Sequence, residues 1–429
     1  MLVTAPATPQ ALFDLWSEVR PPGLPRPALV RGPHVVAALG RLREAAPALF
    51  HVEEVGRSVE GRPLQLLRCG TGPRPILLWS QMHGDEPSAT TALLGLLEYL
   101  HRHAGQPRVS RLLSALTLHV LPLLNPDGAE RFQRRNAQGL DINRDALALQ
   151  TPEGRTLKAL RDRLQPVLGF NLHNQNWRTA VSGTHRPASI SLLAPPFDAE
   201  RHDNPGRVLA KKVCAVIRDA VEPLAPGQVG RYDDSFEARA FGDNLVRWGT
   251  PVVLIETGPR HAPESDEPLV RLNFVALVSA LEALASGAVE HADVDRYASI
   301  PLNRDDGLLH CVIRGAHLFG EAGEAFLGDV GVVAKQAVRT RDGAPCVVLT
   351  GSIEELGDLR VLGAVEVVDG TGLTAVPLPP EGAREGDTLP LPPRERCVLR
   401  QGLPAELMLL RPVAPEGPWR VERVLRYER

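Results

Sequence analysis

Short apolar runs alternate with longer helix-like segments over about the first 290 residues, and this alternation limits the folds open to the chain. Runs bounded by turn residues, such as Pro75–Gln81, predict buried strands, whereas Ser88–Arg102 has the length and apolar spacing of a helix. Strands that alternate with helices form a mixed or parallel sheet, because the helices must pack on its faces. The sequence therefore predicts an α/β domain with a mixed, largely parallel sheet and helices on both faces.

The other segments extend this pattern and divide the chain. Further strands are expected at Leu64–Cys69, Thr117–Leu124, Val167–Leu172, Ile190–Leu193 and Val252–Glu256, and further helices at Pro152–Leu164, Asn204–Val221 and Pro268–Leu284. Beyond Ile300, turn residues separate short strand-like runs at Leu308–Ile313, Val330–Ala334, Cys346–Leu349, Leu359–Val368, Arg396–Arg400, Leu407–Arg411 and Trp419–Arg426. We expect an N-terminal helical extension over 1–50, the α/β domain over 51–299 and a smaller β-rich C-terminal domain over 300–429.

Composition narrows the classes of function. A net charge of -3 provides no basic field for nucleic acid. No apolar run reaches the roughly 20 residues that span a bilayer, and no secretory signal is found, so we expect no membrane partner. The five cysteines form no CxxC pair, which predicts reduced thiols and a cytoplasmic protein. The sequence does not indicate an oligomeric state.

The strand Pro75–Gln81 leads into His83-Gly-Asp-Glu86, and Pro87 begins the next helix. Open α/β sheets bind ligands beyond the carboxyl ends of their strands, where this pair lies. Imidazole nitrogen and carboxylate oxygen are usual donors to zinc, and a catalytic zinc takes three protein ligands plus water. An HxxE pair alone is more often a turn histidine followed by a glutamate at a helix N-terminus. The residues at the ends of the other predicted strands therefore decide between a metal site and an ordinary turn.

Three more predicted strands end in polar residues. Leu116–Leu124 runs into Asn125–Asp145, a loop rich in Asn and Arg, which hold carboxylates and oxyanions in fixed geometry. The run Gly169–His173 ends in histidine, and Pro251–Glu256 places a glutamate after five residues without charge, which is costly unless the carboxylate is paired or functional. Four such ends can converge on one crevice, so the sequence predicts a metal site.

The ordered motifs HxxE, NPDG…RxN…GxDxNR, a strand ending in His and a strand ending in Glu resemble the zinc carboxypeptidase family, the carboxypeptidase A-like metallopeptidases, over roughly Val52–Leu284. The segment Ser58–Pro63 resembles one that often precedes the first strands in bacterial members. The resemblance implies a zinc carboxypeptidase-like fold and one zinc ion per chain. It also implies hydrolysis of an amide or peptide bond next to a free C-terminal carboxylate.

The same resemblance implies roles for the metal-site residues. His83, Glu86 and His173 would be the zinc ligands. Asp141 would orient the first histidine from outside the ligand shell, as metal-bound imidazoles generally require. Glu256 would be the catalytic carboxylate that activates water.

The resemblance also implies substrate contacts. Arg134 would polarise the scissile carbonyl, and Asn143 with Arg144 would hold the terminal carboxylate. The family's mobile tyrosine has one candidate, Tyr232. Asp145 departs from the family pattern, because an aromatic residue usually follows the Asn-Arg pair.

Three functions remain open. The first is a metallocarboxypeptidase acting on peptides. The second is a zinc N-acyl-amino-acid deacylase resembling succinylglutamate desuccinylase and aspartoacylase, and the third is an inactive binding protein. The NPDG element and the segment Arg239–Asn244 favour the peptidase, whereas retention of Glu256 and every ligand argues against the third. The expected partner is a peptide or N-acyl amino acid substrate.

Overall fold

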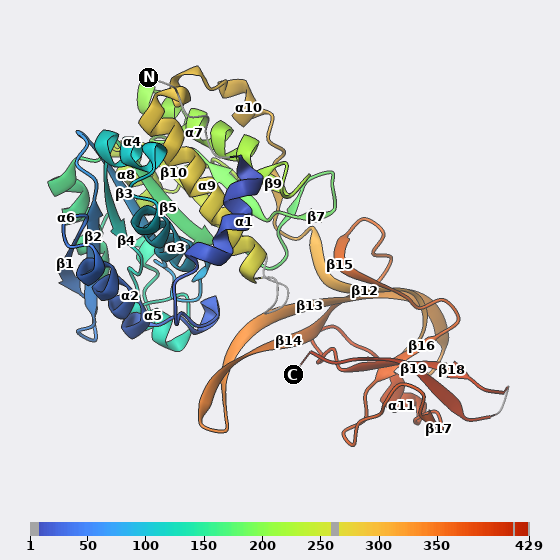
Figure 1. Ribbon diagram of the computed structural model, residues 1–429. Coiled ribbons are helices and arrows are strands. Elements are labelled where there is room, and N and C mark those ends of the chain that lie inside the picture. Colours follow the sequence, from blue (N-terminus) through green and yellow to red (C-terminus); the bar gives the residue numbers. More distant parts are fainter. Residues whose placement is uncertain (1–7, 259–265, 415–416, 428–429) are drawn as a thin grey trace. The chain divides into compact units, whose positions relative to one another are not determined.

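The computed structural model describes residues 8–258, 266–414 and 417–427, which separate into two compact units (Figure 1). The described part of the first unit covers 8–175, 188–258 and 266–303. The second unit contains 176–187 and the described residues from 304 onward. The chain therefore passes from the first unit to the second and back between residues 175 and 188.

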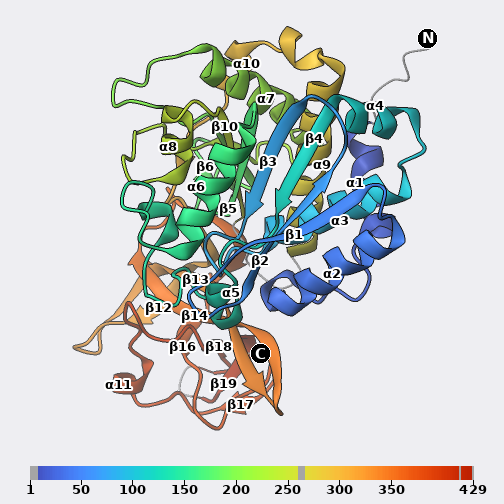
Figure 2. The same cartoon turned by 90° about the vertical axis from the view of Figure 1, so that its left-hand side faces the viewer.

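Within the described residues, the first unit is built on an eight-stranded sheet (Figure 2). In spatial order its strands are β1 (Phe50–Arg57), β2 (Pro63–Cys69), β4 (Leu116–Leu121), β3 (Arg74–Ser80), β5 (Leu168–Asn174), β10 (Val252–Thr257), β8 (Ile190–Leu193) and β9 (Val229–Arg231). The central strands β4, β3, β5 and β10 are parallel, and β2 and β8 flank them in the antiparallel direction. The expected α/β fold class is confirmed.

Helices cover both faces of this sheet (Figure 2). One face packs against α1 (Pro9–Val19), α2 (Gly32–Ala45), α3 (Ser88–Arg102), α4 (Pro107–Ala115), α7 (Pro205–Val221) and α9 (Asp266–Ser286), and the other against α6 (Pro152–Leu164) and α8 (Phe241–Arg247). On β3, Ile76 and Leu78 pack in the core on the face of α3 and α9, and Leu77 and Trp79 pack in the core on the face of α6 and α8. Successive strand residues point to opposite faces, so a strand covered on both sides is apolar throughout.

Helix α9 is long and apolar enough to cross a membrane by length and composition alone. The expectation that the chain has no such apolar run was therefore wrong. Most of its side chains, including Phe274 and Leu277, are nevertheless buried, and it contacts α1, α3, α4 and α7. In this structure α9 is the core helix of the first unit.

The second unit is β-rich, as expected. Its main sheet contains β12 (Leu308–Phe319), β13 (Ala325–Arg341), β14 (Ala344–Gly357), β15 (Gly363–Asp369), β16 (Thr374–Pro377), β17 (Thr388–Leu389), β18 (Leu407–Pro412) and β19 (Trp419–Leu425). Shorter elements of the chain are η1 (Pro27–Leu29), β6 (Ala180–Val181), β7 (Arg186–Pro187), η4 (Ala288–His291), α10 (Val294–Ala298) and β11 (Asn303–Arg304).

The strand expected at Arg396–Arg400 is wrong. The short helix α11 (Arg394–Cys397) lies there, with Pro393 at its N-cap and Glu395 in its first turn. Proline suits a helix start because its ring restricts φ, and because the first turn of a helix does not use the amide hydrogen that proline lacks. An acidic side chain in the first turn interacts favourably with the positive end of the helix dipole. These local preferences outweigh the apolar pattern of the segment.

Candidate metal centre

His83, Glu86 and His173 meet at one end of the central strands. Their nitrogen and carboxylate oxygen atoms lie within 4.8 Å of one another, and all three residues are buried. His83 and Glu86 follow the carboxyl end of β3, and His173 lies near the end of β5, which pairs with β3 in parallel. Parallel neighbours end at the same edge of a sheet, so residues distant in sequence become neighbours there.

One carboxylate contacts both imidazoles. His83 Nδ1 lies 2.7 Å from Glu86 Oε1, and His173 Nδ1 lies 2.8 Å from Glu86 Oε2. The backbone amide of Asn174 also donates to Glu86 Oε2, at 3.2 Å. Burial opposes ionisation of Glu86, but the two histidines outweigh it and hold the pKa of this carboxyl below its usual range. Glu86 is thus a buried carboxylate anion.

The donor set fits a divalent zinc ion. Two imidazoles and a carboxylate are a ligand combination of catalytic zinc sites. Burial lowers the pKa of His173, which favours the neutral imidazole that binds metals. Burial would also lower the pKa of His83, but Glu86 and Asp141 raise it to about 9. The negative charge that attracts a proton to His83 also attracts a metal cation, and the two compete for the same nitrogen.

Asp141 and Arg134 flank the three residues. Asp141 Oδ1 lies 3.0 Å from His83 Nε2, and Asp141 Oδ2 accepts from Arg134 Nε at 3.0 Å. Arg134 Nη1 lies 3.1 Å from His83 Nδ1 and 3.3 Å from Glu86 Oε1. Burial opposes charge on Asp141, but His83 and Arg134 hold the pKa of its carboxyl below its usual range. The structure thus places both residues beside the buried cluster.

Glu256 lies on β10, directly opposite His173 on β5. Residues paired in this way project from the same face of a sheet. Glu256 is half-buried, whereas His173 is only 1% exposed. The carboxylate therefore belongs to the same sheet edge and face as the buried cluster, but lies closer to solvent.

Asn143 and Arg144 belong to the short helix η2 (Ile142–Arg144). Asn143 Oδ1 accepts from the backbone amide of Phe241 at 2.9 Å. Arg144 Nη1 donates to the Asn143 carbonyl at 2.8 Å, and its Nε lies 3.4 Å from Glu237 Oε2. The Arg144 side chain is 38% exposed, so its guanidinium is accessible to a ligand carboxylate.

Tyr232 follows the edge strand β9 and is half-buried. Its backbone amide donates to the Leu192 carbonyl on β8 at 3.0 Å. In the sheet order, β8 separates β9 from β10, which carries Glu256. A substrate-binding role for Tyr232 stays a prediction.

The NPDG segment fixes the backbone around His83. A Cβ atom at Gly84 would lie 2.0 Å from the carbonyl carbon of Gly128, so only glycine allows this approach. Asn125 caps α5 (Pro126–Arg131) by accepting from the Gly128 amide at 2.8 Å, and it donates to the Met82 carbonyl at 3.2 Å. The residues on both sides of the histidine are therefore held by one turn.

Two supporting residues were not identified from sequence. Asn174 Nδ2 donates to Ser88 Oγ at 2.9 Å and to the Thr257 carbonyl at 2.8 Å, which joins β5, β10 and the start of α3. Asp145 accepts from the amide and hydroxyl of Thr151, both at 2.7 Å, and so braces the start of α6. The sequence offered one signal for each residue. Asn174 is a polar residue at the end of a buried strand, and Asp145 stands where the family pattern has an aromatic residue.

Fold and cluster together define an α/β protein with a candidate zinc centre at the carboxyl edge of its sheet. Residues 35–180 match the model of the family described as zinc carboxypeptidase, peptidase M14. Over this segment the chain is similar to the zinc carboxypeptidase family.

Known relatives match over part of the chain. Carboxypeptidase E from Caenorhabditis elegans is 35% identical over 130 residues, covering 25% of this chain and 28% of the relative. Human carboxypeptidase Z is 34% identical over 154 residues, covering 30% and 24%. The chain thus spans about a quarter of the length of these relatives. A metallo-carboxypeptidase structure from Burkholderia cenocepacia aligns with a TM-score of 0.47 and 20% identity, covering 58% of this chain and 69% of that one.

Asp243 in α8 predicts a pH-dependent stability. Burial raises the pKa of its carboxyl to about 6, and it accepts from the Glu237 amide at 3.1 Å. In the unfolded chain the pKa is about 3.9, so folding favours the protonated form and loses stability as pH rises through 6. Asp243→Asn keeps the acceptor without the charge. The unfolding free energy of this variant, relative to that of wild type, should therefore be about 2 kcal/mol higher at pH 8 than at pH 4.5.

Chemical denaturation of both proteins at the two pH values measures this difference. A gain that is the same at both values would show that Asp243 does not carry a buried charge at pH 8. Asparagine keeps a side-chain oxygen that accepts from the backbone amide of Glu237, so loss of this hydrogen bond is a poor explanation of any pH-dependent part of the gain.

Proposed function

We propose that this chain is a zinc-dependent metallocarboxypeptidase, a hydrolase that cleaves an amide or peptide bond next to a free C-terminal carboxylate. The observation that carries the proposal is the buried cluster of His83, Glu86 and His173 with Glu256 opposite His173 on the next strand. The match of residues 35–180 to the zinc carboxypeptidase family model supports it.

His83, Glu86 and His173 would hold one zinc ion per chain. When bound, zinc supplies Lewis-acid polarisation and makes water a better nucleophile near neutral pH. Asp141, 3.0 Å from His83 Nε2, would fix the orientation and tautomer of that ring. Asn174 would hold the Glu86 carboxylate through its backbone amide.

The remaining residues act on water and substrate. Glu256 would take a proton from the attacking water and pass it to the leaving amine. Arg134 would stabilise the negative charge that develops on the scissile carbonyl oxygen, and loss of such a donor typically costs about 10²–10³ in rate. Asn143 and Arg144 would bind the terminal carboxylate, because a guanidinium forms two parallel hydrogen bonds with a carboxylate. Tyr232 remains a candidate substrate contact.

Arg144→Ala should raise KM for substrates with a free C-terminal carboxylate and change it little for their amides. A hydrogen bond to a charged group contributes about 1.5–3 kcal/mol, which corresponds to roughly a ten- to hundredfold increase. Steady-state kinetics on each acid and amide pair measures the effect. Arg247, an exposed arginine of α8, provides the matched control, and Arg247→Ala should behave like wild type.

Substrate comparison tests the proposal itself. A blocked dipeptide with a free carboxylate should be hydrolysed, and its C-terminal amide should not. Equal hydrolysis of both would rule out an exopeptidase and leave Arg144 as a structural loop residue. Hydrolysis of N-succinylated or N-acetylated amino acids alone would identify the deacylase instead.

Further properties are proposed from sequence. The match of Ser58–Pro63 supports a bacterial-type member, although both curated relatives named above are animal proteins. All five cysteines are unpaired, which supports a cytoplasmic protein. The substrate would be a peptide or an N-acyl amino acid, and we expect neither nucleic acid nor a membrane as partner.

A further inference from the structure

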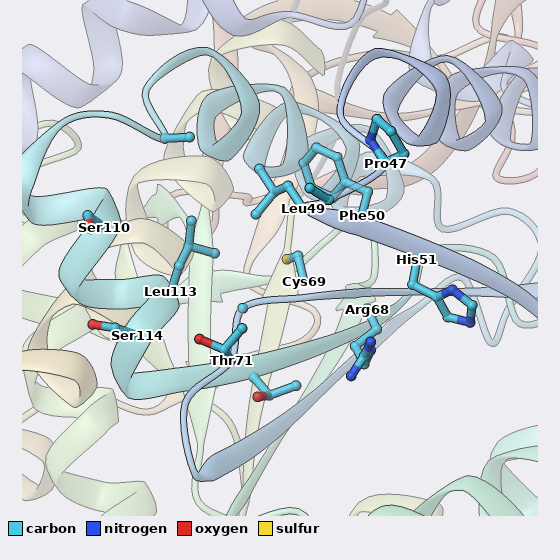
Figure 3. Close-up of a pocket in the computed structure, with 14 residues that line it drawn as sticks. Pro47, Leu49, Phe50, His51, Arg68, Cys69, Thr71, Ser110, Leu113 and Ser114 are labelled. Carbon is cyan, nitrogen blue, oxygen red and sulfur yellow. The ribbon is translucent and has the colours of Figure 1, made fainter.

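The cavity of about 750 Å³ in Figure 3 lies at the amino ends of β3 and β4, whereas the metal centre follows the carboxyl end of β3. Arg68 alternates with Leu67 and Cys69 along β2, so it projects from the sheet face opposite the one that α4 covers with Ser110. The polar side chains around this cavity therefore face different ways and do not converge on one ligand. Two guanidiniums that do converge lie near the metal centre instead.

Arg144 and Arg239 share one carboxylate. Glu237 accepts from Arg239 through both of its carboxylate oxygens, from Nε and from Nη2, each at 3.0 Å. Oε2 of the same carboxylate lies 3.4 Å from Arg144 Nε. The negative charge between the two guanidiniums thus holds side by side two groups that would otherwise repel each other. Two cations and one anion leave the group of three with a net positive charge.

Backbone hydrogen bonds fix this group beside the segment that contains Asn143 and Arg144. The amide of Ala146 donates to the Arg239 carbonyl at 3.2 Å, and the amide of Phe241 donates to Asn143 Oδ1 at 2.9 Å. The loop before α8 is therefore joined to the end of η2 and to the residues that follow it. The position of Arg239 relative to the expected carboxylate-binding pair depends on these two contacts.

Helix α8 holds the same loop from its other side. Asn244 Nδ2 donates to the carbonyls of Ala238 and Ala240, at 2.8 and 2.7 Å, and the Asn244 side chain is buried. Both chain neighbours of Arg239 are thus fixed. A ligand that binds its side chain has little backbone to order, which reduces the entropic cost of binding.

Both guanidiniums keep donors that face solvent. The Arg239 side chain is 59% exposed, and in the described part of the chain Arg239 Nη1 and Arg144 Nη2 have no hydrogen-bond partner. The hydrogen bond with Glu237 contributes most to raising the pKa of the Arg239 guanidinium, and the negative charge of Asp141 contributes as well. Because Asp141 also contacts His83, Arg239 lies on the side of the loop that faces the metal centre.

We propose that Arg239 is a second substrate-binding arginine, which binds the C-terminal carboxylate of the substrate together with Arg144. The inference rests on the proposed carboxypeptidase function, and it assigns to Arg239 a role that the family resemblance does not imply. Glu237 is a positioning residue, because its carboxylate holds the two guanidiniums at a spacing that one carboxylate can bridge. The net positive charge of the group matches a single ligand carboxylate.

Ligand binding to the full-length, zinc-loaded Glu256→Gln protein tests this assignment without turnover. The probes are the blocked dipeptide with a free carboxylate that wild type hydrolyses and its C-terminal amide, each titrated by calorimetry. Arg239→Ala should reduce the preference for the acid over the amide about tenfold, because a charged hydrogen-bond donor is lost. A purely structural defect would weaken the binding of both probes alike and leave the preference unchanged.

The double variant Arg144→Ala with Arg239→Ala separates direct binding from positioning. If both guanidiniums contact the carboxylate, Arg239→Ala lowers the preference further when Arg144 is already absent. No further loss in that background would overturn the proposal, because Arg239 would then act only through Arg144.

Arg360→Ala is the matched control. Arg360 pairs through its Nε and Nη2 with Asp358, two residues earlier in the chain, at 2.8 and 2.5 Å, as Arg239 pairs with Glu237, but it belongs to the second unit. The control should bind both probes like the parent protein. An equal loss of preference in Arg360→Ala and Arg239→Ala would overturn the proposal.

Failure of this inference differs from failure of the proposed function. A wild type that does not distinguish the acid from the amide would remove the carboxypeptidase itself. A wild type that requires the acid, combined with an unchanged preference in Arg239→Ala, would remove only the role of Arg239. If Arg239→Ala does not fold, Arg239→Gln, which keeps most of the length of the side chain, replaces it with the same expected loss.

Discussion

Glu256→Gln should lower kcat by about 10²–10⁴ while the protein keeps its fold and its zinc. Glutamine preserves the shape of the side chain but cannot accept a proton from water, so the defect belongs to the chemical step rather than to binding. Glu256 lies outside the cluster of potential ligand atoms, which is why metal content should not change. Measurement of kcat, KM and zinc per chain on one preparation separates these effects.

Glu98→Gln is the matched control for this variant. Glu98 is also a poorly exposed carboxylate, at 5%, but it lies in α3 among Arg41 and Arg102. It should turn over substrate like wild type. Wild-type kcat in Glu256→Gln would remove the proton-transfer role, and an equal loss in both variants would indicate a general effect of carboxylate removal on the fold.

The central strands could be predicted because both of their faces are buried. On β3 the side chains alternate between two cores, and the sequence is therefore apolar throughout. The edge strand β1 gave no such signal. Several of its side chains are exposed, and a bulge between Glu54 and Gly56 interrupts the alternation.

The length of the hairpin β13–β14 could not be predicted from the sequence either. Only Val330–Ala334 and Cys346–Leu349 were expected, but the strands extend to the turn at Asp342 and Gly343. Residues near the turn are polar and exposed, and they are held by pairing with each other. Backbone pairing of this kind leaves no apolar period in the sequence.

In the candidate site, residues at strand ends were predictable and contacts between loops were not. His83, His173 and Glu256 follow apolar runs whose ends share one edge of a parallel sheet. The ion pair of Arg144 with Glu237, in contrast, joins the short helix η2 to a loop far away in sequence. It depends on how both segments fold, and neither has a periodic sequence pattern.

His173→Ala should weaken zinc binding by more than about a hundredfold. Removal of a partner outside the ligand shell already costs about 10–100-fold, and His173 would be a direct ligand. The loss leaves two donors where a catalytic zinc takes three. The measurement is a competition titration against a metal chelator, with zinc per chain determined after dialysis.

Two further variants give this prediction a scale and a control. Asp141→Asn, which alters only the contact at His83 Nε2, should fall between wild type and His173→Ala. His202 belongs to a second, more exposed group with Asp198 and Glu200 whose oxygen and nitrogen atoms also lie within 4.8 Å. Water competes for the metal at an exposed group of this kind, which weakens zinc binding there. His202→Ala should therefore keep one zinc per chain. If His202→Ala loses the zinc and His173→Ala retains it, the metal belongs to the exposed group, and the buried cluster is not the zinc centre.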